Sequence, residues 1–468
     1  MANVNRRDFI KLAGSAALAT GLQPWQQAAG AAEQNKPNVI FMFADQMRAQ
    51  AMGCAGNTCV DTPNLDRMAA EGLHLTNAIS CEPICTPFRG QLLTGRYPHT
   101  TGITDNDIRL PDDEMTVGEA FKNGGYRTGY IGKWHLAGYR NDPVDKKNRR
   151  GWDYWAVENC DHNHFHFRYY DAEEKKHVMK GWEPYNQTDL ATDFIQENRD
   201  NPFCLFMSFG PPHNPYTGPE SLRHLYHDVP DRPNLNKGER WQYKHITPYY
   251  QMINSLDQCV GRIIDALKEN GIDRNTIVCF SSDHGDMLQS QGHRRKRRPW
   301  EESINIPFIA RYPDGIPPGR QEDFLFASVD IMPTLLGLAG VPIPDGVEGW
   351  NMADAFMQRG NPEERDAVFL FHNDSGDEEH QEHRWAVPDW RGIRTKEWVY
   401  AYHTKGEWVL YNLRDDPYEL NNLIDDPKYA EKKKELRERT EQMRRELGED
   451  IPLIDVGRTG IKLPPPRV

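Results

Sequence analysis

The segment from Cys85 to Arg89, which reads CTPFR, combines a nucleophile, a helix start and a fixed cation. Pro87 lies where a helix could begin, which would place Cys85 just before the helix N-terminus. Free amide groups and the positive end of the helix dipole favour an anion there and lower the pKa of a thiol. Arg89 adds a forked cation that suits a tetrahedral oxyanion. The segment predicts a nucleophile inside an anion pocket, with a structural or disulfide-bonded cysteine as the ordinary alternative.

Four other segments place polar residues at the end of a continuous apolar run. The runs 39–44, 128–131, 203–209 and 276–280 lead into Asp45 and Gln46, Lys133 and His135, His213, and Asp283 and His284, respectively. Continuous apolar runs are typical of strands that are buried on both faces of a parallel sheet. Ligands of such sheets bind beyond the carboxyl ends of the strands. We therefore expect these polar residues to share one edge of the sheet.

Helical patterns accompany these strands and set the fold class. They cover residues 64–71, 116–123, 250–269 and 329–339. Strands that alternate with helices predict a doubly wound α/β fold with a mostly parallel central sheet. Short strands at 390–395, 398–402 and 408–412 and a charged helix at 428–447 predict a small α+β subdomain. The expected division is a catalytic α/β domain at 32–370 and the C-terminal subdomain at 371–468.

With these elements in place, the chain resembles the type I sulfatases of the alkaline phosphatase superfamily. The segment 85–89 matches their CxPxR maturation motif, which continues through Thr94, Gly95 and Arg96. Further segments similar to the family stand in family order at 38–46, 125–135, 212–215, 282–285, 301–307 and 410–423. The ordered set covers nearly all of the chain after the first thirty residues, so it is far more specific than an isolated CxPxR.

The resemblance changes the expected chemistry of Cys85. In this family the cysteine is oxidised to formylglycine by a separate maturation enzyme, and the aldehyde hydrate is the nucleophile. Sulfate transfer to the hydrate would give a covalent ester, which divides one hard hydrolysis into two easier steps. The resemblance therefore implies a formylglycine at position 85 and a sulfate-ester substrate.

The resemblance also implies roles for five other residues. His135 would take a proton from the hydrate, while Arg89 and Lys133 would hold it and offset developing charge. Lys296 stands where the family has a sulfate-binding lysine. Lys296 and His213 would then serve the side of the leaving group, with His213 as the proton or hydrogen-bond donor.

Asp45, Gln46, Asp283 and His284 match the family's metal positions. A hard divalent ion suits a carboxylate-rich site and polarises a sulfate oxygen. Calcium is the expected ion because the family uses it by default. Gln46 and His284 depart from an all-carboxylate or amide set, and imidazole is a poor calcium ligand, so magnesium, manganese or an outer role for His284 stay open.

Two unusual segments flank these motifs. The basic run 293–298 around Lys296 predicts a cationic rim for a polyanionic substrate, with a solvated charge run as the alternative. The segment 152–170 is rich in aromatic residues and holds His162, His164 and His166. We interpret it as an aromatic, hydrogen-bonding wall of the pocket, with a second metal site as the less favoured alternative.

The first 31 residues predict export. Arg6 and Arg7 form a twin-arginine pattern, followed by an apolar stretch at 12–22 and small residues at 28–32. This is typical of a twin-arginine signal peptide, which implies the export machinery as a partner and a periplasmic or secreted protein. An exported chain could oxidise its cysteines, and Cys54/Cys59 or Cys81/Cys85 would be local pairs.

Composition excludes several classes of protein. The 468 residues carry 56 Lys and Arg against 69 Asp and Glu, a formal charge of −13, which argues against a general nucleic-acid binder. The longest apolar runs fall short of the roughly 18 to 20 residues that a spanning helix needs, which excludes an integral membrane protein. With 38% hydrophobic residues the chain can build a large core.

The predicted function is hydrolysis of sulfate esters, on a sulfated sugar or polysaccharide. One alternative is a phosphonate monoester or phosphodiester hydrolase of the same superfamily, which shares the nucleophile and metal positions. Lys133 and His135 favour the sulfatase, because those relatives tend to carry other groups there. The other alternative is a non-catalytic protein that binds sulfated glycans and keeps Cys85 unconverted.

Overall fold

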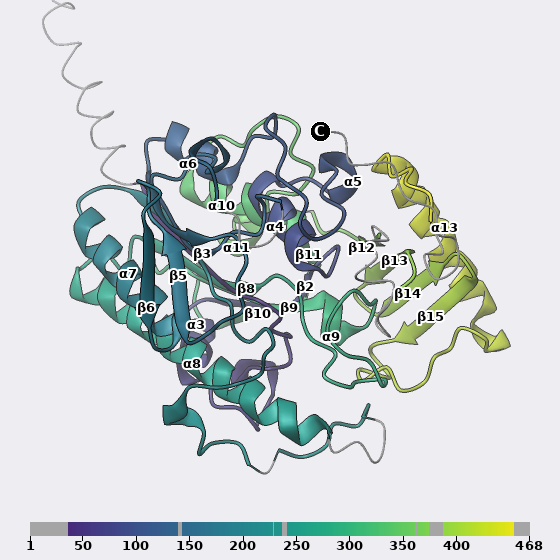
Figure 1. Ribbon diagram of the computed structural model, residues 1–468. Coiled ribbons are helices and arrows are strands. Elements are labelled where there is room, and N and C mark those ends of the chain that lie inside the picture. Colours follow the sequence, from purple (N-terminus) through teal and green to yellow (C-terminus); the bar gives the residue numbers. More distant parts are fainter. Residues whose placement is uncertain are drawn as a thin grey trace, which may run out of the picture.

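The computed structural model describes residues 36–138, 143–227, 229–235, 241–360, 363–373 and 387–453. They form an 11-stranded sheet and a 4-stranded sheet with helices around them (Figure 1). The predicted export signal at 1–31 lies outside the described residues. Among the residues that the structure describes, no helix combines the length and apolar character needed to cross a bilayer.

The four predicted apolar runs form adjacent parallel strands at the centre of the large sheet. Their order is β3 (Arg127–Lys133), β7 (Phe203–Ser208), β1 (Asn38–Ala44) and β8 (Thr276–Ser282). Residues in all four strands are buried almost throughout, as expected for strands covered on both faces. The doubly wound, mostly parallel sheet predicted from the sequence is confirmed.

Other strands extend the sheet on both sides. On the side of β3, β4 continues the parallel order, and β5 and β6 follow antiparallel. On the side of β8, β9 is antiparallel and leads to β2, which pairs in parallel with β10 and β11. The bounds are β2 (Leu73–Ile79), β4 (Tyr154–Glu158), β5 (His166–Tyr170), β6 (Lys176–Lys180), β9 (Asn305–Arg311), β10 (Arg320–Glu322) and β11 (Phe326–Ala327).

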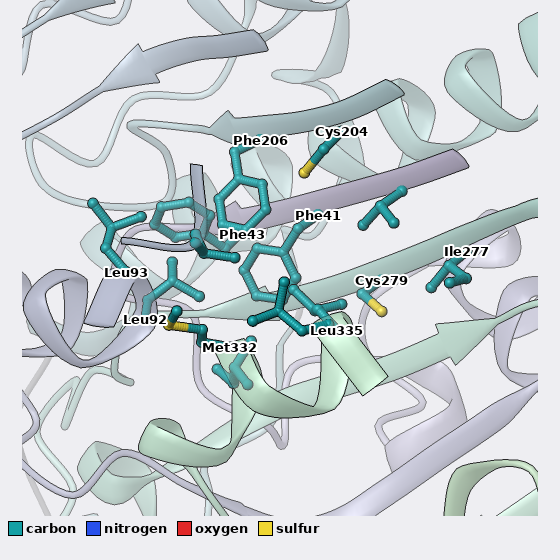
Figure 2. Packing of buried hydrophobic residues seen from close by; sticks show 14 of the residues in the cluster. Phe41, Phe43, Leu92, Leu93, Cys204, Phe206, Ile277, Cys279, Met332 and Leu335 are labelled. Atoms are coloured by element: carbon teal, nitrogen blue, oxygen red, sulfur yellow. The ribbon is translucent and has the colours of Figure 1, made fainter. Parts of the chain in front are cut away.

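Helices cover both faces of the large sheet, and β1 alternates its side chains between these two faces. Phe41 and Phe43 pack against the face of α4, α6, α10 and α11, and Figure 2 shows Met332 and Leu335 of α10 close to their rings. Ile40 and Met42 face the cluster of α3, α7 and α8. The bounds are α3 (Pro63–Ala70), α4 (Cys85–Thr94), α5 (Pro98–Thr101), α6 (Val117–Asn123), α7 (Glu183–Asn198), α8 (Trp241–Glu269), α9 (Glu301–Ile304), α10 (Ile331–Ala339) and α11 (Ala353–Phe356).

The C-terminal region forms the antiparallel 4-stranded sheet, in the order β12 (Ala367–His372), β13 (Trp390–Thr395), β14 (Trp398–His403) and β15 (Gly406–Asn412). Helix α13 (Ala430–Glu446) packs on it through Leu436 and Met443. The three strands and the charged helix expected here are present, and β12 adds a fourth strand. The domain division at residue 371 stays a prediction, and β12 spans it.

Candidate active site

The site is built around the first residue of α4. This helix runs from Cys85 to Thr94 and its N-cap, Ile84, offers no side-chain hydrogen bond. Cys85 is therefore the first helical residue, not the residue before the helix as expected, and it is 1% exposed. The cysteine lies among the polar residues that follow the central strands, so the expected shared edge of the sheet is what the structure shows.

Asp45 and Asp283 meet because they follow the neighbouring parallel strands β1 and β8. Ligand atoms of Asp45, Cys85, Asp283 and His284 all lie within 4.8 Å of one another. The backbone N–H of Gln46 donates to Asp283 Oδ1 at 2.9 Å. Gln46 has φ 74°, a left-handed conformation that costs a non-glycine residue energy and is concentrated at functional sites.

Two lysines reach Cys85. Lys133 Nζ lies 3.8 Å from Cys85 Sγ and 2.6 Å from Asp45 Oδ2. Lys296 Nζ lies 2.8 Å from Cys85 Sγ and 3.1 Å from His284 Nε2. Both lysines are buried. Lys133 can enter because Gly132 precedes it: a Cβ at Gly132, which has φ +104°, would lie 2.0 Å from the backbone oxygen of Ser208.

Arg89 completes the cation cluster from the first turns of α4. Its guanidinium donates to the backbone oxygen of Lys133 at 2.6 Å and to Ser208 Oγ at 2.8 Å. Asp45 Oδ2 and Asp283 Oδ2 each lie 3.6 Å from Arg89 Nη2, too far for a strong hydrogen bond. Arg89 Nη2 makes no hydrogen bond to a described residue. The cluster therefore holds donor capacity that the protein does not use.

The expected low pKa of the Cys85 thiol is wrong. Burial raises the pKa to about 11, with a further rise from the Asp45 carboxylate. Lys133 and Lys296 act in the opposite direction but do not outweigh burial. The desolvation of a wholly enclosed thiolate, which sequence reasoning did not include, is larger than the benefit of nearby cations. The unmodified thiol is not a ready nucleophile at neutral pH.

The donor set suits a divalent cation. Asp283 Oδ2 and Gln46 Oε1 are buried and accept no hydrogen bond from a described residue. Burial raises the pKa of Asp45, but Lys133, with weaker help from Lys296, holds it well below its ordinary value, so this carboxylate stays charged. Unpartnered carboxylate and amide oxygens beside a fixed negative charge are the ligands that hard cations prefer.

His135 follows β3 and is oriented to accept a proton. Its Nε2 lies 3.0 Å from Asp107 Oδ1, which makes Nε2 the N–H donor and leaves Nδ1 as the basic nitrogen. Nδ1 is buried and makes no hydrogen bond to a described residue. Burial, with Lys133 and Arg89, holds the pKa of His135 well below its ordinary value, so the ring is neutral. Sequence reasoning missed Asp107, because an aspartate in a loop carries no signal of its partner.

His213 follows β7 and packs against the histidine-rich segment. Its ring lies flat on the His162 ring, with centroids 4.0 Å apart and planes at 8°. His164 is bound to Glu183 and to the backbone oxygen of His213, and His166 is exposed. The three histidines therefore do not converge, and among the described residues the metal-type cluster is the one at Asp45. The second-metal alternative gains no support.

The prediction for the basic run 293–298 is only partly correct. Lys296 lies in the site, as described above. Arg297 is buried and pairs with Asp105 at 2.8 Å, and Arg298 is buried against the backbone oxygens of Arg294 and Lys296. Arg295 is exposed and Arg294 is half-buried. Only these two can belong to a rim, because neighbours in a tightly folded loop point in different directions.

All eight cysteines lie in the described residues and are free. The possible local pairs Cys54/Cys59 and Cys81/Cys85 are therefore not formed. Cys85 instead faces Lys296 and Asp45.

A small cavity borders the site one strand beyond β3. Its volume is about 190 Å³, and it lies past the carboxyl end of β4, whose Glu158 pairs in register with Lys133 of β3. It is lined by Glu158, Asn159, Cys160, Asp161, Arg168, Tyr170 and Lys176. Because β3 and β4 are parallel, the cavity and the Lys133 site open at the same edge of the sheet.

This arrangement coincides with the match to known families. The family model described as "Sulfatase" matches residues 37–341, and one described as "N-sulphoglucosamine sulphohydrolase, C-terminal" matches residues 290–446. The first match spans the parallel sheet and every predicted site residue. The chain belongs to the sulfatase family, and this confirms the family and the sulfuric ester hydrolase class predicted from the sequence.

Relatives and solved structures agree with this assignment. An "Ulvan-active sulfatase" of Formosa agariphila is 35% identical over 90% of this chain and 83% of that protein. An "Endo-4-O-sulfatase" of Bacteroides thetaiotaomicron is 33% identical over 93% of this chain and 96% of that protein. A solved structure described under metabolism of multiple glycosaminoglycans by Bacteroides thetaiotaomicron has a TM-score of 0.79 and 31% identity, over 88% of this chain and 97% of its own.

Proposed function

We propose that this enzyme removes sulfate from a sulfated carbohydrate, with Cys85 converted to formylglycine beside a divalent cation. The observation that carries the proposal is the convergence of two buried lysines on Cys85 Sγ, at 2.8 and 3.8 Å. Two ammonium groups at the nucleophile position suit an anionic group in transfer, because buried cations aimed at developing charge stabilise the transition state. The family resemblance of the segment 85–96 supports the conversion.

The residues around position 85 would divide the work. When present, the formylglycine supplies a hydrated aldehyde as nucleophile, and the cation polarises a sulfate oxygen. His135 accepts a proton through Nδ1, held in that orientation by Asp107. Arg89 and Lys133 hold the hydrate and offset developing charge, and Lys296 binds the sulfuryl oxygens. His213 Nδ1 donates to the backbone oxygen of Asn214, and burial lowers the pKa of the free ring. His213 would therefore donate from Nε2 to the oxygen of the departing alcohol once a bound sulfate anion favours the protonated ring.

Asp45, Gln46, Asp283 and His284 would hold the cation, with calcium as the first candidate and magnesium or manganese as alternatives. His284 Nε2 already accepts a hydrogen bond from Lys296, so His284 is the weakest candidate ligand of the set. Exhaustive chelation, checked by elemental analysis, should abolish sulfate release, and adding calcium should restore more of it than adding magnesium or manganese. Full activity in verified metal-free enzyme would contradict the metal proposal.

A carbohydrate substrate is supported by the names of the relatives and by the 190 Å³ cavity. That volume is below the roughly 300 Å³ of ordinary ligand pockets, so it suits a single small polar unit such as the neighbouring sugar. Lys176 would favour an acidic unit there, whereas Arg168 is paired with Asp161 of the same lining. Export by the twin-arginine machinery to the periplasm or beyond, after folding and maturation by a separate enzyme, completes the proposal.

The test is a panel of sulfated mono- and oligosaccharides with free sulfate as the readout, run beside phosphonate monoesters. We expect rapid sulfate release from at least one acidic, sulfated saccharide and little hydrolysis of phosphonates. Lys176→Ala should raise KM for acidic oligosaccharides and leave KM for sulfated monosaccharides unchanged. Lys175→Ala, at the neighbouring exposed lysine, is the control. Much faster turnover of phosphonate monoesters than of every sulfate ester would overturn the proposed function.

A further inference from the structure

Behind His213 lies a buried pair, His164 and Glu183, to which the proposed reaction assigns no role. His164 is 2% exposed and Glu183 is 1% exposed. His164 Nδ1 lies 3.0 Å from Glu183 Oε2, and His164 Nε2 lies 2.9 Å from the backbone oxygen of His213. The imidazole therefore links the carboxyl group of Glu183 to the main chain of His213.

Glu183 holds the same loop at a second point. Its Oε1 accepts from the backbone N–H of Gly210 at 3.2 Å and from Gln187 Nε2 at 2.9 Å. The loop 210–213 is thus attached to one carboxyl group at both ends, directly at Gly210 and through His164 at His213. Glu183 is the first residue of α7, where the helix dipole favours a negative charge. A rigid helix therefore fixes the position of the loop.

Both partners of His164 are oxygens that ordinarily accept hydrogen bonds. A backbone carbonyl has no proton to give, so His164 Nε2 must carry a hydrogen. Nδ1 then either carries a second hydrogen and donates to the Glu183 carboxylate, or accepts a proton held by Glu183. In either case one buried hydrogen bond joins the imidazole to the carboxyl group, which suits a group that fixes geometry.

The ring of His213 depends on the position of its main chain. His213 Nδ1 lies 2.7 Å from the backbone oxygen of Asn214, and one face of the ring stacks on His162. These contacts fix the rotation of the ring, whereas the position of the loop sets the distance between the ring and Cys85. We infer that His164 and Glu183 are positioning residues that hold His213 where it can meet the leaving-group oxygen, an inference that rests on the proposed function.

The leaving group distinguishes positioning from a merely structural role. A sugar alcohol leaves poorly and needs a proton or hydrogen bond from His213, whereas nitrophenolate leaves without that help. Displacement of His213 should therefore slow release of sulfate from a sugar and spare release from 4-nitrophenyl sulfate. Damage to the fold, to the metal site or to Cys85 should slow both substrates equally.

The experiment compares kcat and KM on both substrates for His213→Ala, Glu183→Gln, His164→Asn and His164→Gln. His213→Ala should reduce kcat on the sugar sulfate by about 10²-fold and affect the aryl sulfate much less. Glu183→Gln and His164→Asn should show the same selectivity with a loss of about 10-fold or more, because small displacements of a catalytic group are costly. His164→Gln should retain more activity than His164→Asn, since its longer amide can donate to the His213 carbonyl. His166→Ala, in the exposed histidine of the same run, is the matched control.

Each outcome decides one question. Equal losses on both substrates for Glu183→Gln and His164→Asn, or no loss on either, would overturn the positioning role while leaving the proposed function in place. No leaving-group dependence in His213→Ala would overturn the role of His213 and the inference with it. No sulfate release by wild-type enzyme would overturn the proposed function itself. Thermal unfolding checks each variant, and if His164→Asn does not fold, Glu183→Gln, which preserves volume, provides the same comparison.

Discussion

Two groups of buried charges in this molecule differ in how completely they are paired. Arg391, on β13 of the small sheet, forms a two-point pair with Glu449 at 2.9 and 2.8 Å and also donates to three backbone oxygens. Arg89, in the site, lies 3.6 Å from its two carboxylates and leaves Nε and Nη2 without a hydrogen bond to the described residues.

The difference shows what each group is for. A buried ion pair stabilises a fold only when its geometry is excellent and its remaining polar atoms are satisfied, and Arg391 meets both conditions. Unused donors and acceptors inside a protein cost stability, so a site that keeps them is suited to a ligand that completes them. Substitutions should therefore damage activity in the site around Arg89 and stability in the group around Arg391.

The largest effect is expected at the nucleophile. Cys85→Ala should reduce sulfate release by at least about 10³-fold, because no other group can form the covalent intermediate. The midpoint of thermal unfolding should stay close to that of the wild type, since the variant removes one buried thiol and both neighbouring lysines keep other partners. Turnover in Cys85→Ala within about 10-fold of the wild type would show that the chemistry lies elsewhere.

The next effect concerns the fully paired group. Arg391→Ala should lower the free energy of unfolding by about 3 kcal/mol, because Glu449 keeps only the partly exposed Arg444 as a partner and three backbone oxygens lose their donor. Arg439→Ala, which breaks a more exposed pair with Asp366, is the control and should cost about 1 kcal/mol or less. Urea unfolding measures both. A loss of activity in folded Arg391→Ala as large as in Cys85→Ala would remove the distinction between the two regions.

A smaller effect is expected at the surface beside the site. The double variant Arg294→Ala/Arg295→Ala should raise KM for a polymeric sulfate about 5-fold at low salt and leave KM for a sulfated monosaccharide unchanged. The reason is that exposed charges act mainly by attracting polyanions. Arg199→Ala, an exposed arginine at the end of α7, is the control. Unchanged activity on the polymer at low salt would rule out the cationic rim.

The smallest effect is a pH dependence of stability. Burial raises the pKa of Glu449, but Arg391 and Arg444 outweigh it and lower the pKa below the ordinary value of 4.5. A carboxylate with a lowered folded-state pKa stabilises the fold above its unfolded pKa, and the contribution disappears as pH falls through the folded value. The stability difference between wild type and Glu449→Gln should therefore be full at pH 7 and shrink below about pH 4. A difference that is constant across this range would contradict the pairing.

The fold and the choice of site residues could be predicted because they rest on local patterns. The continuous apolar run before Asp45 identifies β1, and the polar residues after each such run identify the edge of the sheet. The helix 116–123 was predictable for the same reason: Thr116 and Glu119 form a capping box at its start. These signals are contained within a few residues, so they survive without knowledge of the tertiary structure.

Other features depend on the tertiary structure and could not be predicted. The pKa of Cys85 depends on its complete burial, which no local pattern reports. Arg297 and Arg298 look like solvated charges in sequence, but the loop turns them inward. Glu183 gives no sign of its link to His213, because the two residues lie on different elements that only packing brings together.

The central claim is that the incompletely paired cluster acts on sulfate through a converted Cys85. Mass spectrometry of the peptide that contains residue 85, from a preparation with measured sulfatase activity, tests it most directly. We predict that the active enzyme has lost the sulfur of Cys85 and carries an aldehyde, which a hydrazide reagent captures. An active preparation in which every residue 85 is an intact cysteine would contradict the account.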